Sequence, residues 1–243
     1  MSGYIELHAH SAYSFAVGAC SPRKMVRGAK RLGLSGLALL DYDGVYGLME
    51  ARAAAREADL AFLPGCEFTL EDETHLPVIC RSDQGYSALT GAISAHHLAA
   101  GRREADRQNL DALASWAKGQ WLVLTGTRAG PLRRVLKHSG IAAAARFLEQ
   151  LKEMFGAENV AVEAALAGFD GEERLAAQLD HLARKTKLPL VATSAARCAD
   201  PASQHLADVM TATRLARPLD KIQDDLPACH ALSLIHISEP TRR

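Results

Sequence analysis

The sequence predicts an α/β fold in which seven strand–helix units close into a distorted (β/α)7 barrel, similar in plan to a TIM barrel. Short apolar runs alternate with longer amphipathic stretches along most of the 243 residues. Strands that alternate with helices favour parallel pairing within one sheet. The chain contains no G-x-G-x-x-G or G-K-[ST] phosphate loop, which favours a barrel over an open nucleotide-binding sheet.

The predicted strands are short apolar runs of the length expected for buried strands. They cover residues 4–8, 36–41, 61–68, 75–80, 121–126, 159–164 and 188–194. Because parallel strands of a barrel end at one rim, polar side chains that follow these runs are candidates for a shared site.

Amphipathic stretches between these runs predict the helices, at residues 25–34, 48–60, 141–156 and 173–187. Ser21 and Pro22 suit an N-cap followed by proline at the first helical position. Gly156 is a plausible C-terminal stop for the third of these helices. The polar segment 82–120 is expected to form helices outside the barrel.

Composition excludes several classes of function. Lys plus Arg and Asp plus Glu both total 28, so the net charge gives no global reason to bind nucleic acid or an anionic membrane. The five cysteines form no C-x-x-C pair, which argues against a disulfide framework or a cysteine zinc cluster. No apolar stretch approaches the ~20 residues of a membrane span, and no signal pattern is present. We therefore expect a cytoplasmic protein without a membrane partner.

The first strand carries the clearest chemical pattern, His8-Ala9-His10. Residues i and i+2 of a strand point to one side, so both imidazoles aim from the carboxyl end of this run. Two such imidazoles suit Zn²⁺, Mn²⁺ or Fe²⁺. Alternatively, His10 is a turn residue and His8 a core histidine. Glu67 and His75 flank neighbouring strand ends and could converge on the pair to complete a metal site.

Three stretches give the sequence a family resemblance: ELHAHSAYSF, LALLDYDGVYGLMEA and LPGCEFTL. Together they resemble the PHP (polymerase and histidinol phosphatase) domain at the N-terminus of bacterial DNA polymerase III alpha subunits, most closely the error-prone, DnaE-type subunit. WLVLTGTRAGPLRRVL and LVATSAARCADPASQHLADVMTATRLARPLD extend the resemblance over nearly all of 4–231. It implies a PHP-type barrel in residues 1–200 and a helical link in 201–231. It further implies polymerase domains, with their Mg²⁺, that this chain lacks.

The resemblance also implies a metal site that this chain has partly lost. The family's metal ligands are kept at His8, His10, Glu67 and His75, and replaced at Val17, Tyr42, Thr127, Ala195 and Arg197. A phosphoesterase site with several metals needs bridging carboxylates, and neither valine nor alanine can ligate. Arginine places a fixed positive charge where a cation would sit, and we expect it to pair with Glu67 or Asp41. The site should therefore hold one divalent ion or none, and we expect no catalytic residue here.

The function expected from the resemblance is that of a scaffold domain in a DNA-directed DNA polymerase, a nucleotidyltransferase of replication and damage tolerance. Expected partners are the missing polymerase domains of the same chain and, for the full-length protein, DNA and accessory proteins. The alternatives are a stand-alone metal-dependent PHP phosphoesterase and a non-catalytic interaction module. Residues 232–243, LSLIHISEPTRR, resemble a translated sequencing adapter and are expected to be a non-native tail.

Overall fold

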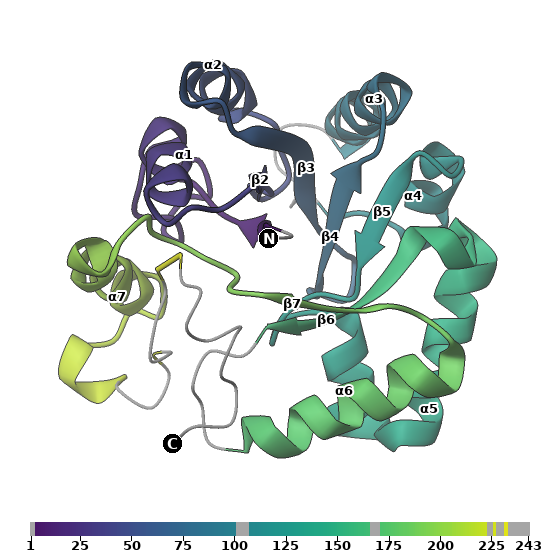
Figure 1. Cartoon of the computed structure of the whole chain (residues 1–243). Coiled ribbons are helices and arrows are strands. Elements are labelled where there is room, and N and C mark those ends of the chain that lie inside the picture. The colour runs from purple at the N-terminus through teal and green to yellow at the C-terminus, as the bar shows by residue number, and fades with distance from the viewer. Residues whose placement is uncertain (1–2, 101–106, 166–170, 223–225, 227–230, 233–243) are drawn as a thin grey trace.

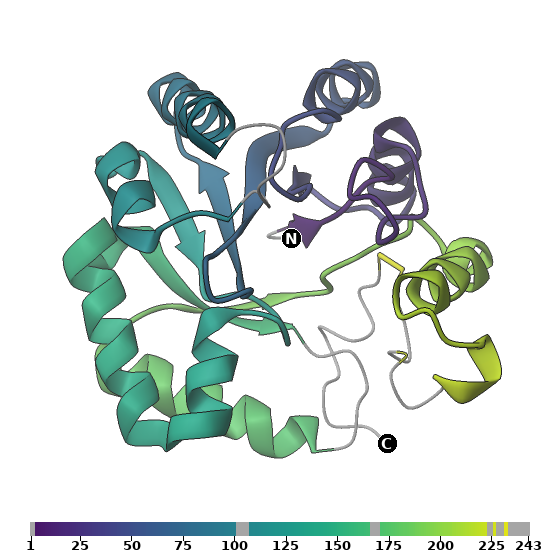
Figure 2. The ribbon, with the colours of Figure 1, turned by 180° about the vertical axis from the view of Figure 1, so that it is seen from behind.

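Seven strands form one sheet in which every strand pairs with its neighbour in the sequence, in the order β1-β2-β3-β4-β5-β6-β7. The computed structural model describes residues 3–100, 107–165, 171–222, 226 and 231–232. Figures 1 and 2 show the strands curled into a nearly closed barrel with helices around the outside. The predicted (β/α)7 barrel is therefore confirmed.

The strands match the predicted runs to within one or two residues at most ends. They are β1 (Ile5–Ala9), β2 (Gly36–Leu39), β3 (Ala61–Thr69), β4 (His75–Cys80), β5 (Trp121–Leu124), β6 (Val160–Ala165) and β7 (Leu190–Thr193). The helices are α1 (Pro22–Arg31), α2 (Leu48–Ala58), α3 (Asp83–Ala100), α4 (Leu110–Ala117), α5 (Pro131–Phe155), α6 (Glu172–Thr186) and α7 (Gln204–Arg214). Short 3₁₀ turns, η1 (Ala157–Asn159), η2 (Pro201–Ser203) and η3 (Leu219–Lys221), complete the described elements.

The expectation of parallel pairing is wrong for one strand, β4, which runs antiparallel to both β3 and β5. A parallel step needs a crossover connection of about a dozen residues or more, and the five residues between Thr69 and His75 allow only a hairpin. The reversal has a consequence for the site. Because β4 runs backwards, its first residue, His75, pairs with Thr69 at the rim where the other strands end.

Helix boundaries follow local capping chemistry. The Ser21 side chain accepts a hydrogen bond from the Lys24 amide at 3.3 Å, and Pro22 opens α1, as predicted. α5 is longer than predicted because it begins at Pro131, ten residues before the expected start, and continues through a kink at Gly140. It ends at Phe155, and the residue after it, Gly156, has a φ of 90°, a conformation that favours glycine. Helices α3 and α4 occupy the segment predicted to lie outside the barrel.

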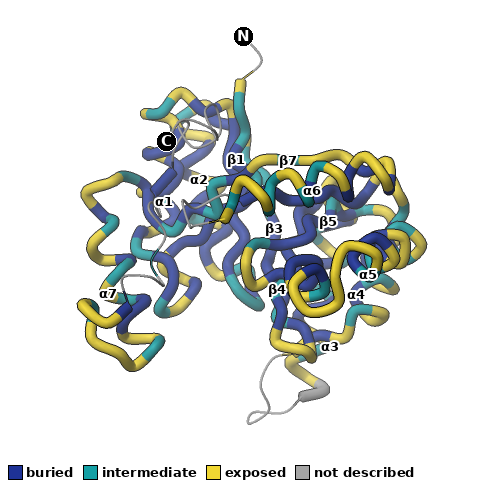
Figure 3. The backbone as a smooth tube through the Cα atoms, turned by 90° about the horizontal axis from the view of Figure 1, so that it is seen from below, coloured by how far each residue is buried: buried dark blue, intermediate teal, exposed yellow. Residues whose placement is uncertain are grey.

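Alternate residues along the strands supply two different faces of the core. Leu37 and Leu39 of β2 pack with α1 and α2 residues, whereas Ala38 and Leu40 join a small cluster with Ile79, from β4. The alternation follows from the period of two in a strand. Figure 3 shows the result, with buried strands at the centre and exposed residues on the outer helices.

The barrel closes where β1 meets β7. Ala9 and Ala196 form an isolated parallel bridge, and the His10 amide donates to the Ala196 carbonyl at 2.8 Å. Nearer the start of β1, Glu6 Oε2 accepts a hydrogen bond from the Ser194 amide at 3.0 Å and another from the Ser194 hydroxyl at 2.5 Å. A buried carboxylate thus replaces strand ladder bonds along part of this seam.

Two sequence expectations concern residues that the structure describes only in part. Most of the 232–243 tail lies outside the described residues, and so does part of the 201–231 link, so the proposed domain limits stay predictions. Among the described helices, none is both long and apolar enough to cross a bilayer.

Candidate metal centre

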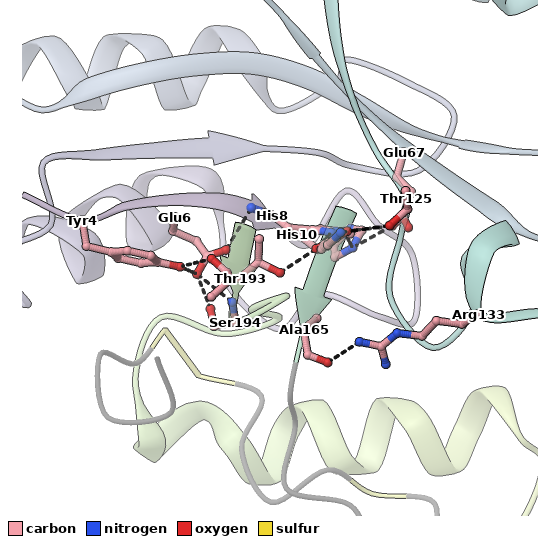
Figure 4. Close-up of polar contacts among 12 residues, drawn as sticks. Tyr4, Glu6, His8, His10, Glu67, Thr125, Arg133, Ala165, Thr193 and Ser194 are labelled. Atoms are coloured by element: carbon pink, nitrogen blue, oxygen red, sulfur yellow. Dashed lines mark hydrogen bonds and ion pairs between the residues drawn. The ribbon is translucent and has the colours of Figure 1, made fainter. Parts of the chain in front are cut away.

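His8, His10 and Glu67 converge at the carboxyl end of the barrel. The Nε2 atom of His8 lies 3.2 Å from Glu67 Oε2, and the Nε2 atom of His10 lies 3.0 Å from the same oxygen. The two Nε2 atoms are 3.3 Å apart. All three side chains are buried, and Figure 4 shows them pointing toward one another. The sequence prediction that these three residues share one rim therefore agrees with their positions.

Their placement follows from the strands that carry them. His8 lies in β1 and His10 one residue past its end, while Glu67 is near the end of β3. The sheet order puts only β2 between β1 and β3, and all three strands are parallel. Long side chains at the ends of β1 and β3 can therefore meet across the barrel mouth.

The donor geometry fits a cation. At the usual Zn–N and Zn–O lengths of about 2.0–2.2 Å, a tetrahedral ion places its donors about 3.3–3.6 Å apart. The three observed separations, 3.0 to 3.3 Å, are slightly shorter than this. Two imidazoles and one carboxylate are also a ligand set that suits Zn²⁺, Mn²⁺ or Fe²⁺. These three residues could therefore hold a single metal ion, which would act there as a Lewis acid or a structural crosslink.

Glu163 of β6 supports the group from behind, and the sequence analysis missed it. Its Oε1 atom lies 2.7 Å from His8 Nδ1 and accepts a hydrogen bond from the Thr193 hydroxyl at 2.5 Å. Both His8 and Glu163 are fully buried. A carboxylate on the far nitrogen of a histidine fixes its tautomer and directs the other nitrogen outward. The available signal was a single acidic residue among the apolar residues of 160–164.

Asp41, just past β2, organises the loop that carries His10. Its carboxylate accepts from the Ser11 amide at 2.7 Å, from the Ser11 hydroxyl at 2.6 Å and from the Ser14 hydroxyl at 2.6 Å. The Ser14 hydroxyl oxygen also lies 3.0 Å from His10 Nδ1. The Ser14 hydroxyl therefore holds His10 through Nδ1, just as the Glu163 carboxylate holds His8 through Nδ1.

Burial and mutual charge shift the pKa values of the group in different directions. Burial disfavours a charged His8, but the carboxylates of Glu163 and Glu67 outweigh it and raise the pKa of His8 well above its usual value. Burial lowers the pKa of His10, with Glu67 acting against it. Burial alone would raise the pKa of Glu67, yet the two imidazoles hold it well below its ordinary value. Glu67 is thus an ionised buried carboxylate, which favours binding of a cation.

Tyr42 separates His75 from the three converging residues. The centroid of its ring lies 4.7 Å from that of His10 and 4.7 Å from that of His75. His75 is half-buried, and its Nδ1 atom lies 3.3 Å from the Thr69 hydroxyl. Burial, followed by the nearby Glu67 charge, raises the pKa of Tyr42, so its phenol stays neutral. His75 shares the rim but lies outside the compact group of donors.

The remaining substituted positions carry no ligand chemistry. Val17 is buried in the loop after β1, and Thr127 follows β5. Ala195 has a left-handed φ of 46° just past β7. The expected ion pair of Arg197 is wrong: within the described part of the chain, Glu67 binds the two histidines and Asp41 binds the serines. The charge of Arg197 lowers the pKa of Tyr42, against the effect of burial.

The PHP domain family model matches residues 6–165, which include His8, His10, Glu67 and His75. This chain belongs to the PHP domain family. The match covers β1 through β6 and therefore the whole group of donors.

Curated relatives of this PHP chain are named error-prone DNA polymerase. The protein of Mycobacterium bovis is 40% identical over 227 residues, which cover 89% of this chain and 21% of the relative. The protein of Nocardia farcinica is 35% identical, covering 90% of this chain and 24% of the relative. The chain thus spans between a fifth and a quarter of the length of these two relatives.

Solved structures support the fold. A protein from Bifidobacterium adolescentis, assigned as a metal-dependent phosphoesterase, superposes with a TM-score of 0.55 at 17% identity and covers 86% of this chain and 97% of its own. An amidohydrolase from Chromobacterium violaceum, with bound sulfate and no metal, gives a TM-score of 0.55 at 18% identity, over 78% of this chain and 86% of its own. At these identities the similarity concerns the fold alone.

Proposed function

We propose that this chain is the N-terminal PHP domain of a bacterial error-prone DNA polymerase of the alpha-subunit type, and that it serves there as a scaffold. The observation that carries the proposal is the set of relatives named error-prone DNA polymerase, which match this chain along almost its full length. Their greater length supports the idea that polymerase domains accompany this one in the parent protein. Nucleotidyl transfer, its Mg²⁺, and contacts with DNA and accessory proteins then belong to the full-length enzyme in the cytoplasm.

We further propose that the domain holds one divalent ion through His8, His10 and Glu67. Their buried donors lie at separations close to those of a tetrahedral site, and the Glu67 carboxylate is ionised. His75 is the fourth residue retained from the family pattern, and the Tyr42 ring lies against it. We therefore propose that the three converging residues are the main ligands of the ion.

The same arrangement argues against the stand-alone phosphoesterase. Hydrolysis across several metals requires carboxylates that bridge the ions and offset their charge. Glu67 is the one carboxylate among the three converging residues, and Val17 and Ala195 occupy positions where the family resemblance expects acidic ligands. A single ion bound this way can stabilise the barrel mouth without supplying the symmetric clamp of a phosphodiesterase.

Metal analysis of the purified chain tests the site. After dialysis against Zn²⁺ or Mn²⁺, we expect close to one equivalent of metal, reduced to background by His8→Ala or Glu67→Gln. The exposed histidine His138 provides the control, because His138→Ala removes an imidazole elsewhere on the surface and should leave the stoichiometry unchanged. Three equivalents of metal, together with turnover of p-nitrophenyl phosphate or a dinucleotide, would support the phosphoesterase instead.

The polymerase assignment has its own test in the gene. The reading frame downstream of codon 231 in source DNA should encode a polymerase palm with paired aspartates. A stop codon shortly after codon 231 would contradict the parent-enzyme proposal and leave the metal site unaffected.

A further inference from the structure

The described helices around the barrel leave an opening between α2 and α3. Each parallel strand step is covered by a crossover helix, but β3 and β4 are joined by a hairpin and have no helix of their own. Figure 1 shows α2 and α3 on either side of these two strands, and Figure 2 shows the same opening from behind. The start of β3 is consequently only partly covered, and Phe62 and Leu63 are half-buried.

A groove with a volume of about 510 Å³ occupies this opening. Its apolar lining comes from α2, β3 and α3, and includes Leu48, Met49, Phe62, Leu63, Pro64 and Tyr86. Met49 is 69% exposed, an unusual position for a large apolar side chain on a helix that packs against a barrel. The groove lies at the start of β3, at the opposite end of that strand from Glu67. It is therefore separate from the candidate metal centre.

The rim of the groove is basic. Among the described residues, its lining includes Arg52 and Arg56 on α2 and Arg81 after β4, with Asp83 as the one acidic residue. The Arg81 guanidinium donates a hydrogen bond to the Asn159 side chain. Within the described part of the chain, neither Arg52 nor Arg56 is in an ion pair. Met49, Arg52 and Arg56 are spaced by three and four residues, so they lie on one face of α2. One helix thus presents an apolar side chain and two unneutralised cations to the same groove.

An apolar floor with a charged rim is the usual anatomy of a protein–protein interface, and arginine, methionine and aromatic residues are enriched there. A small-molecule pocket would instead place a few polar groups inside. Nucleic acid is disfavoured as an occupant because the floor is largely aliphatic and the chain as a whole has no net charge. The shape and charge together favour a segment that offers apolar side chains on one face and carboxylates beside them.

We propose that the groove between α2 and α3 binds an acidic, amphipathic helix from a partner protein. The bound helix takes the place of the crossover that the β3–β4 hairpin omits. Its apolar residues at helical spacing fill the floor beside Met49 and Phe62. Its carboxylates face Arg52 and Arg56, which makes the association dependent on ionic strength.

Selection from a random library tests this without assuming a partner. A library of random 20-residue peptides displayed on phage is selected against the purified chain, and enriched peptides are measured by fluorescence anisotropy. We expect enriched peptides to be acidic, with apolar residues every three or four positions, and to bind at least tenfold more weakly to the Arg52→Glu/Arg56→Glu double variant. Binding should also weaken as the salt concentration rises.

The matched control is the double variant Lys137→Glu/Arg146→Glu, which makes the same charge change at exposed positions of α5. It should alter peptide affinity by less than twofold. Both double variants should keep the circular dichroism spectrum and the Zn²⁺ stoichiometry of the unmodified chain, because all four positions are exposed and none belongs to the three converging residues. If a variant keeps its fold and its metal binding but loses affinity for the peptides, the loss bears on the groove and not on the proposed metal site.

Several results would overturn the proposal. Enriched peptides that are basic, or that bind the Arg52→Glu/Arg56→Glu variant as well as the unmodified chain, would place recognition elsewhere. A dimer in sedimentation equilibrium that Met49→Glu dissociates would identify a second copy as the occupant. Binding of a 20-nucleotide single strand that is lost in the Arg52→Glu/Arg56→Glu variant would favour nucleic acid.

Discussion

Replacing Glu163 with glutamine should weaken metal binding although Glu163 does not itself face the ion. The carboxylate lies 2.7 Å from His8 Nδ1 in a fully buried environment and holds the imidazole so that Nε2 faces Glu67. Loss of such a supporting partner typically lowers metal affinity by about 10- to 100-fold, which corresponds to roughly 1.4 to 2.7 kcal/mol. Glutamine keeps the length of the side chain, so the change removes charge and basicity with little loss of packing.

The assay is competition for Zn²⁺ against a chromophoric chelator at pH 7.5. Glu153→Gln on α5 makes the same chemical change at an exposed position and should have no effect. An affinity for Glu163→Gln within twofold of the unmodified chain, with an unaltered fold, would refute the supporting role of this residue.

The same variant makes a prediction about pH in the metal-free protein. The pKa of His8 is raised in the folded state, so its interaction with Glu163 and Glu67 stabilises the fold fully below the unfolded pKa of about 6.5. That contribution is lost as the pH rises through the higher folded pKa. Glu163→Gln should therefore lower the free energy of unfolding more at pH 6 than at pH 10, measured by urea denaturation in the presence of EDTA. An equal loss at both values would show that His8 is not charged in the fold.

Two further predictions concern the site and the barrel. Tyr42→His places an imidazole between His10 and His75, so metal analysis should show more than one equivalent of Zn²⁺ per chain; a value still at one would show that missing carboxylates, not the tyrosine, limit the site. Gly126→Ala should destabilise the fold, because Gly126 has a φ of 81° and an added Cβ would lie 2.7 Å from Gly130 Cα. We expect a loss of about 2 to 4 kcal/mol from backbone strain plus overpacking. Gly140→Ala has open space around it, but its φ of 76° and ψ of −179° lie in a region essentially restricted to glycine, so it should lose about 1 to 3 kcal/mol from backbone strain alone. Thermal unfolding of both variants measures the two losses.

The sequence by itself determined the elements and the first half of the site. Apolar runs of strand length and amphipathic stretches are local signals, so the strands and most helices could be located without knowing their neighbours. The spacing His8-x-His10 fixed the common direction of two imidazoles because side chains alternate along a strand. The position of Glu67 near the end of the third apolar run made it a candidate for the same rim, the family pattern pointed to it as well, and its Oε2 atom lies 3.0 Å from His10 Nε2.

The tertiary structure decided how these elements meet. The reversal of β4 depends on the short link before it. It places the first residue of β4, His75, at the rim, whereas the first residue of a parallel strand would lie at the opposite end of the barrel. Glu163 looked like part of an apolar run, because nothing nearby in sequence shows that its partner is a histidine 155 positions away. Arg197 carried the charge expected of a partner for Glu67, yet the two histidines already occupy that carboxylate. Such pairings depend on distances across the closed barrel, and a linear sequence carries no direct record of those distances.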